Sequence, residues 1–226
     1  MKTLRVALLQ LDVAWGNPQA NRAKVRRALD GLAPCDLAIL PELWSGSYDN
    51  PRMEALAEES PACLEEVATW CRDTGSWALA GTLPWRTPEG LANRAFLLDE
   101  AGGVRGTYDK VHLFPLLAEP EHFIPGKAPL LASLRGAHFA AAVCYDIRFP
   151  EFLRRMALDL GGRVELDVLL RQRGRVVAHH AVLGDQGAHR FITGNTRGGR
   201  SRRGGGWDRR SHGGRGRGLE PHGREN

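Results

Sequence analysis

Residues 138–150 read HFAAAVCYDIRFP: an apolar run ends at Cys144, and a polar turn and a helix-like stretch follow. This pattern predicts a buried strand over 138–143 and a helix over 149–159, with Cys144 on the turn between them. At such a turn, unpaired backbone N–H groups and the positive end of the helix dipole favour a thiolate. A single cysteine at a strand end is more often a buried small hydrophobic side chain, so Cys144 indicates catalysis only if chemical partners accompany it.

Two other apolar segments also end at a charged residue. Residues 36–44, DLAILPELW, stop at a proline and place Glu42 at the C-terminal edge of a predicted strand. Residues 103–114, GVRGTYDKVHLF, alternate in polarity and place Lys110 in the same way. Ligands and catalytic groups in α/β folds gather at the carboxyl ends of strands. Three strand ends that supply Glu, Lys and Cys therefore form a candidate constellation for nucleophilic catalysis.

The remaining periodicity indicates an α/β fold. Further strands are predicted over 4–11, 36–40, 76–83, 92–99 and 104–109, and further helices over 17–31 and 62–73. The sequence EAGG at 100–103 predicts a hairpin turn between the last two of these strands.

The chain resembles the nitrilase (carbon–nitrogen hydrolase) superfamily over residues 1 to about 160. The resemblance is carried by four motifs in the family's order: PELW at 41–44, DKVHLF at 109–114, EPEHFIPG at 119–126 and CYDIRFPEF at 144–152. The opening strand VALLQLD and the segments GTLPW and NRAFLLDEAGG add to it. Four motifs in order, each at a predicted strand end or an adjoining loop, are a specific signal. The resemblance implies the α-β-β-α sandwich of the nitrilase type.

The resemblance also implies a role for each matching residue. Cys144 is the nucleophile, which attacks an amide carbonyl carbon and forms a thioester as ammonia leaves. Glu42 is the general base, a role that works best when burial raises the carboxyl pKa. Lys110 stabilises the oxyanion together with the backbone N–H that follows Cys144, that of Tyr145. Glu119 matches the family's second glutamate, which orients the lysine and the attacking water.

Further implications concern substrates and partners. The segments HLFPLLAEPEHF and CYDIRFPEF are most similar to the omega-amidase-like branch, whose members hydrolyse the amides of small dicarboxylic acids. A small linear amide and water are the expected reactants, while nitriles, carbamoyl amines and other amides stay open as substrates. The family uses no metal or organic cofactor, and its intact members usually form homodimers.

Taken singly, Glu42, Lys110 and Glu119 would each be interpreted as a solvated charge, and only their combination favours catalysis. Asp146 and Arg148 are expected to pair and to shape the turn after Cys144, and binding of a substrate carboxylate by Arg148 is the minor alternative. The histidines at 112, 122 and 138 have neither the spacing nor the accompanying carboxylate residues of a metal site. We therefore expect them to pack against other side chains or to be exposed to solvent.

The cysteines and the first apolar segment indicate the cellular compartment in which the protein is expected. The four cysteines, at positions 35, 63, 71 and 144, show neither CxxC pairs nor a disulfide-like framework, which suits a reducing environment. The first apolar segment, Leu4 to Leu11, is too short for a signal or membrane helix. We therefore expect a cytoplasmic protein without a membrane partner.

Residues 161–226 differ in composition from the first 160. They hold 16 of the 27 glycines and 14 of the 31 basic residues, all arginine, with 6 acidic residues, so their net charge is +8. Residues 1–160 hold 17 basic and 20 acidic residues, a net charge of −3. We interpret 1–160 as a carbon–nitrogen hydrolase domain and 161–226 as an aberrant, partly disordered Arg/Gly-rich tail. On this interpretation the sandwich is incomplete at its C-terminus.

Three hypotheses address this tail. A frameshift in the coding sequence, beginning between Asp159 and Arg171, accounts best for an abrupt, lysine-free Arg/Gly composition where a core strand is due. A tail that binds RNA ranks second, because regular RGG spacing and interleaved aromatic residues are missing. A truncated, non-catalytic relative is the third. In this part of the chain, 164–170 could add one strand, and little after Phe191 could add another.

Overall fold

The structure is a computed structural model that describes residues 4–159, 164–166, 171–172, 175–176, 179–184 and 190–194, all within one compact unit, Met1–Thr196. Its longer elements are listed in chain order: β1 (Arg5–Leu9), α1 (Pro18–Asp30), β2 (Leu37–Ile39), α2 (Met53–Thr74), β3 (Trp77–Thr87), β4 (Gly90–Leu98), β5 (Val104–Asp109), α3 (Glu119–His122), β6 (Leu130–Leu134), β7 (Ala137–Val143), α4 (Pro150–Asp159), β8 (Val164–Leu166), β9 (Arg171–Gln172), β10 (Arg175–Val176), β11 (His179–Gly184) and β12 (Arg190–Gly194).

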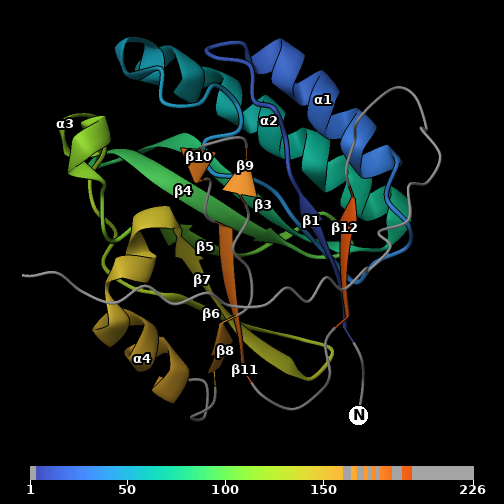
Figure 1. Cartoon of the computed structure of the whole chain (residues 1–226). Helices are drawn as coiled ribbons and strands as arrows, with labels where there is room; N and C mark the ends of the chain where they lie inside the picture. Colours follow the sequence, from blue (N-terminus) through green and yellow to red (C-terminus); the bar gives the residue numbers. More distant parts are fainter. Residues whose placement is uncertain are drawn as a thin grey trace, which may run out of the picture. The chain divides into compact units, whose positions relative to one another are not determined.

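The strands form two main sheets (Figure 1). The larger has the order β12-β1-β2-β3-β4-β5; it is parallel from β12 to β3 and antiparallel from β3 to β5. The smaller has the order β6-β7-β11-β8 and is antiparallel throughout. Strands β9 and β10 pair with each other. The parallel pairing brings the carboxyl ends of β1, β2 and β3 to one edge of the larger sheet.

Alternating side chains show that the larger sheet is covered on both faces. Along β1, Ala7 and Leu9 belong to the core beneath the helices α1 and α2, whereas Val6 and Leu8 belong to the core shared with the smaller sheet. A strand buried on both faces reads as a continuous apolar run, which is the pattern of this segment.

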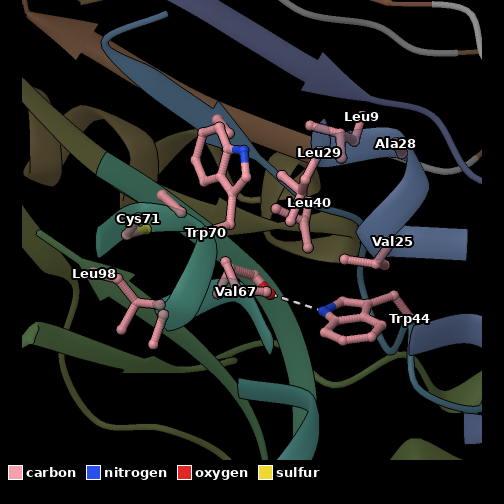
Figure 2. Packing of buried hydrophobic residues seen from close by; sticks show 14 of the residues in the cluster. Leu9, Val25, Ala28, Leu29, Leu40, Trp44, Val67, Trp70, Cys71 and Leu98 are labelled. Atoms are coloured by element: carbon pink, nitrogen blue, oxygen red, sulfur yellow. Dashed lines mark hydrogen bonds between the residues drawn. The ribbon is translucent and has the colours of Figure 1, made fainter. Parts of the chain in front are cut away.

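The core under α1 and α2 is packed around two tryptophans (Figure 2). Trp44 is fully buried, and its indole Nε1 donates a hydrogen bond to Ala80 O at 2.8 Å. This bond satisfies the one polar atom of a large buried ring. Ten of the buried residues in this core are labelled in Figure 2: Leu9, Val25, Ala28, Leu29, Leu40, Trp44, Val67, Trp70, Cys71 and Leu98.

The smaller sheet is covered in the same way by α4. On β7, Phe139 and Ala141 face the larger sheet, while Ala140 and Ala142 pack against Met156 of α4. The layers are therefore helices, sheet, sheet and helix, and the predicted α-β-β-α sandwich is confirmed. Every strand and helix predicted within 4–159 is present, with ends that differ by a few residues except in α2.

Helix α2 and strand β6 depart from the prediction for the first 160 residues, and the short helix α3 was not predicted. Helix α2 begins at Met53, nine residues before the predicted start, and continues through Pro61. Proline in a helix interior costs a hydrogen bond, but the buried face of α2 on both sides of Pro61 outweighs that loss. Strand β6, which no pattern predicted, forms a hairpin with β7.

The later part of the chain also supplies strands. The sequence predicts one strand over 164–170 and little after Phe191, whereas the structure has β8, β11 and β12 in the two main sheets. Strand β12 pairs with β1, and β11 pairs with β7. The glycine- and arginine-rich stretch from 197 onward lies outside the described residues, so the division at residue 160, the frameshift, the disorder and the RNA-binding tail stay predictions.

Candidate active site

The loop that carries Glu42 is held by an irregularity in the neighbouring strand. The pairing of β3 with β4 shifts register between Leu79 and Thr82. At this point Thr82 N donates to Pro41 O (3.1 Å), and Thr82 Oγ1 accepts from Leu43 N (2.8 Å). The backbone on both sides of Glu42 is thus bonded to β3, which fixes the glutamate at the end of β2.

Gly81, inside this irregularity, makes the close approach possible. Its φ is +66°, and a Cβ there would lie 2.0 Å from Pro41 O. Gly81→Ala should therefore destabilise the fold by about 2–4 kcal/mol and displace the Glu42 loop. Urea unfolding measures the loss. Gly75→Ala is the matched control, because Gly75 has nearly the same φ (+64°) with nothing within 4 Å of its Cβ position. Equal losses for the two variants would contradict the role of the contact with Pro41.

Lys110 directly follows β5, and two backbone hydrogen bonds hold it. Its N–H donates to Asn93 O (3.0 Å), and its carbonyl accepts from Gly126 N (2.9 Å). A Cβ on Gly126 would lie 1.9 Å from Asp109 O, so this glycine lets the chain after α3 pack against the lysine backbone. Lys110 is completely buried.

Glu119 begins α3 and is also completely buried. Its Oε2 accepts from Phe114 N (2.6 Å) and lies 2.6 Å from Lys110 Nζ. The six-residue segment from Phe114 to Glu119 is thus closed by the glutamate side chain, which turns the carboxylate toward the lysine.

Cys144 adopts a strained backbone conformation, with a φ of +48°. Left-handed backbone is unfavourable for a residue with a Cβ, and the buried carboxylate of Asp146 holds the turn in place. This carboxylate accepts from Val143 N (2.8 Å), from the Tyr108 hydroxyl (2.6 Å) and from His112 N (3.0 Å), and it lies 2.8 Å from His112 Nδ1.

The prediction that Asp146 pairs with Arg148 is wrong. In the described part of the chain the partners of Asp146 are Tyr108, His112 and the backbone before Cys144, and no ion pair joins it to Arg148. The physical reason is that Asp146 points into the protein and is fully buried, where neutral donors from β5 and β7 surround it.

The side chains of Glu42, Lys110 and Glu119, predicted separately from the sequence, meet in one buried cluster. Lys110 Nζ lies 2.8 Å from Glu42 Oε1 and 2.6 Å from Glu119 Oε2, and all three side chains are at most 3% exposed. The Cys144 thiol lies close enough to Glu42 for the charge of that carboxylate to raise the thiol pKa, and the charge of Lys110 acts on it in the opposite direction. The nucleophile, the base and the cation named by the resemblance are therefore neighbours.

Burial controls the proton positions in this cluster. Burial and the charge of Glu42 raise the pKa of the Cys144 thiol to about 12, although Lys110 opposes them. Burial also raises the pKa of Glu119, with Glu42 adding to the effect and Lys110 opposing it. Burial alone would lower the pKa of Lys110, but the charges of Glu42 and Glu119 outweigh it and raise that pKa. The resting cluster thus contains a protonated lysine and a protonated thiol.

This result corrects the expectation of a resting thiolate at a helix N-terminus. A short 3₁₀ segment, Cys144–Arg148, separates the cysteine from α4, which begins at Pro150. The thiol therefore lies away from the α-helix dipole and beside a carboxylate, so it needs a base before it can react.

Sequence reasoning missed two residues of the cluster. Asn93, on β4, is fully buried, and its Nδ2 lies 2.9 Å from Glu42 Oε1 and 2.8 Å from Glu119 Oε1. Tyr48 is the second, because burial, followed by the charge of Glu42, raises the pKa of its hydroxyl. A polar residue in the middle of an apolar strand was the available signal for Asn93.

The ring of Tyr145 packs beside two other rings, with centroid separations of 5.0 Å to Phe114 and 5.3 Å to Phe149. The role predicted for its backbone N–H in an oxyanion site stays a prediction. His112 stacks on Phe149 at 3.6 Å, in line with the expected packing role.

Within the described part of the chain, no three His, Cys, Asp or Glu side chains form a metal-binding group. Among the described helices, none combines the length and the apolar character needed to cross a membrane.

Comparisons with known proteins show which proteins this chain is similar to. The chain is 34% identical over 159 residues to the omega-amidase YafV of Escherichia coli (strain B / BL21-DE3), which covers 69% of this chain and 60% of the relative. It is 30% identical over 155 residues to the 2-oxoglutaramate amidase of Bacillus subtilis (strain 168), covering 66% and 59%. The matched region thus spans about three fifths of the length of these relatives.

One solved structure is similar to this chain at about the same sequence identity as these relatives. It is a variant of an amidase from Nesterenkonia sp. AN1 that shows covalent addition of the acetamide moiety of fluoroacetamide at the active-site cysteine. The TM-score is 0.63 with 30% identity, over 70% of this chain and 61% of that one. The family model for carbon-nitrogen hydrolases matches residues 5–179, which include the whole buried cluster and Cys144. The chain belongs to the carbon–nitrogen hydrolase family.

Proposed function

We propose that this chain is an amidase that hydrolyses the carbon–nitrogen bond of a small linear amide, with Cys144 as nucleophile. The observation that carries the proposal is the buried cluster of Glu42, Lys110 and Glu119, with the Cys144 thiol within the electrostatic influence of all three. A thiol beside a carboxylate base and a buried ammonium is the arrangement that nucleophilic attack on a carbonyl requires.

The first half of the reaction forms a thioester. Glu42 takes the proton of the Cys144 thiol, and the sulfur attacks the carbonyl carbon. The Lys110 ammonium stabilises the oxygen that becomes negatively charged, a role it can perform because its own charge is fixed by two carboxylates. Glu42 then gives its proton to the amide nitrogen. The carbon–nitrogen bond breaks, ammonia leaves, and the acyl group remains on the sulfur.

The second half consumes water. Glu42 takes a proton from a water molecule, the hydroxyl oxygen adds to the thioester carbon, and the carbon–sulfur bond breaks. The proton returns to the sulfur, so the products are the carboxylic acid and the free thiol. Glu119 holds Lys110 throughout and is proposed to orient the attacking water.

Within this class, we propose the ω-amides of small dicarboxylic acids as substrates. The support is the similarity to two amidases of this kind, together with the segments HLFPLLAEPEHF and CYDIRFPEF. The second candidate is a non-catalytic relative, favoured by the fact that the match spans about three fifths of these proteins.

Ammonia release from a panel of amides tests both the proposed amidase activity and the proposed substrate class. The full chain should release ammonia from succinamate and glutaramate at least ~10-fold faster, in kcat/KM, than from neutral butyramide, because the carboxylate of these two amides adds binding energy. Equal rates on the three amides would contradict the proposed substrate class but not the proposed amidase activity. The absence of ammonia from every amide, with a folded chain and a free Cys144 thiol, would favour the non-catalytic relative.

A further inference from the structure

The cluster contains one residue that contacts all three of its charged members. The backbone oxygen of Asn93 accepts from Lys110 N (3.0 Å), and its side-chain Nδ2 lies within 2.9 Å of both Glu42 and Glu119. Lys110 Nζ closes the arrangement on the other side. The four side chains therefore form a closed ring in which each carboxylate lies between two donors.

The orientation of the Asn93 carboxamide follows from its neighbours. Nδ2 has two hydrogens, one for each carboxylate, whereas a flipped amide would place Oδ1 against two carboxylate oxygens. The observed orientation leaves Oδ1 buried with no hydrogen-bond partner among the described residues. Because buried polar atoms are normally paired, an asparagine at this point is poorly explained by stability. The two donated bonds are the feature that accounts for it.

We propose that Asn93 is a positioning residue of the proposed amidase, whose carboxamide keeps Glu42 and Glu119 apart and aims the Glu42 carboxylate at the Cys144 thiol. Oε1 of Glu42 accepts from both Lys110 and Asn93, which uses the two lone pairs of that oxygen. Without Asn93, Glu119 would keep its bonds from Lys110 and from Phe114 N, whereas Oε1 of Glu42 would keep only the bond from the Lys110 ammonium. This inference rests on the proposed function.

The test is the pH profile of iodoacetamide alkylation at Cys144, followed by peptide mass spectrometry on the full chain. Cys144 is partly exposed, while Cys35, Cys63 and Cys71 are buried, so the reagent has one preferred target. The acid side of the profile reports protonation of Glu42, the base that the thiol faces, in the presence of Lys110, Glu119 and Tyr48. Alkylation needs no amide turnover, so failure of the proposed function and failure of this inference are distinguishable.

Asn93→Ala removes both donated bonds without adding charge. Bonds to a charged carboxylate lower its pKa, so their loss should move the acid side of the profile to higher pH by about one unit, a ~10-fold slower alkylation at a fixed pH on that side. Asn93→Asp should shift it further, because a third carboxylate joins the ring. If the aspartate variant fails to fold, the alanine variant carries the test.

The matched control is Asn21→Ala. Asn21 is also buried, and its Nδ2 also donates two bonds, to the carbonyls of Ala14 (2.7 Å) and Ser45 (2.8 Å). This variant should lose stability and keep the parent profile. The inference is overturned if the Asn93 variants have a lower melting temperature with an unchanged profile, or if Asn21→Ala shifts the profile by the same amount.

Discussion

Replacing Cys144 with alanine is expected to abolish ammonia release from amides, by a factor of about 10⁴ or more. The thioester cannot form without the sulfur, and the remaining members of a catalytic set contribute little once the nucleophile is lost. The fold should persist, because the turn is held by Asp146 and its donors rather than by the thiol. Ammonia release and thermal unfolding, measured on the same preparation, check both parts.

Cys35→Ala is the matched control for this experiment. Cys35 is a buried cysteine that directly precedes the Asp36–β2 segment, at the opposite end of β2 from Glu42, and burial raises the pKa of its thiol. Its replacement should leave ammonia release within about twofold of the parent. Equal release from Cys144→Ala and the parent would remove Cys144 as the nucleophile, whatever the effect of Cys35.

The catalytic candidates could be predicted because each lies at the end of an apolar strand. The apolar runs of β2 and β7, the proline after β2 and the alternation along β5 are local signals, and they are sufficient to place Glu42, Lys110 and Cys144 at strand ends. The resemblance added Glu119, which no periodicity marks. Local pattern thus determined which residues reach the edge of the sheets.

The remaining features depend on packing between distant segments. Asp146 was assigned to the nearby Arg148, yet its partners are Tyr108 and His112, more than thirty positions earlier in the chain. The protonation of Cys144 depends on how deeply the cluster is buried, which a sequence pattern does not reveal. Asn93 also bonds to residues that are distant in the sequence: one glutamate lies 51 positions before it and the other lies 26 positions after it.

Lys110→Met is expected to have the largest effect on stability. It preserves the length of the side chain and removes the one charge that Glu42 and Glu119 share in the buried cluster. Breaking a buried ion pair from one side typically costs about 3–5 kcal/mol, because a charge is left without compensation. Here two carboxylates are left, so urea unfolding at pH 7 should show a loss at the upper end of that range. Ammonia release should also fall by at least ~10²-fold, because the oxyanion loses its cation.

The loss of stability in Lys110→Met should depend on pH with a definite sign. Without the ammonium, burial and mutual repulsion raise the folded-state pKa of the two carboxyls above the unfolded value of about 4.3. The folded state then binds more protons than the unfolded state, so stability is highest near that pH and falls as the pH rises through the raised values. In the parent, Lys110 opposes the rise in the pKa of Glu119. The stability of the parent should therefore fall less than that of Lys110→Met as the pH rises.

Lys24→Met provides the control, since Lys24 is a half-buried lysine whose ammonium donates to the backbone carbonyl of Asp12 at the protein surface. It should shift the unfolding free energy by no more than about 0.5 kcal/mol and leave the pH dependence of the parent unchanged. A Lys110→Met variant as stable as Lys24→Met between pH 5 and 8 would contradict a buried, charged cluster. It would mean that the carboxyls are already protonated in the parent, and Glu42 could not then act as the base toward Cys144.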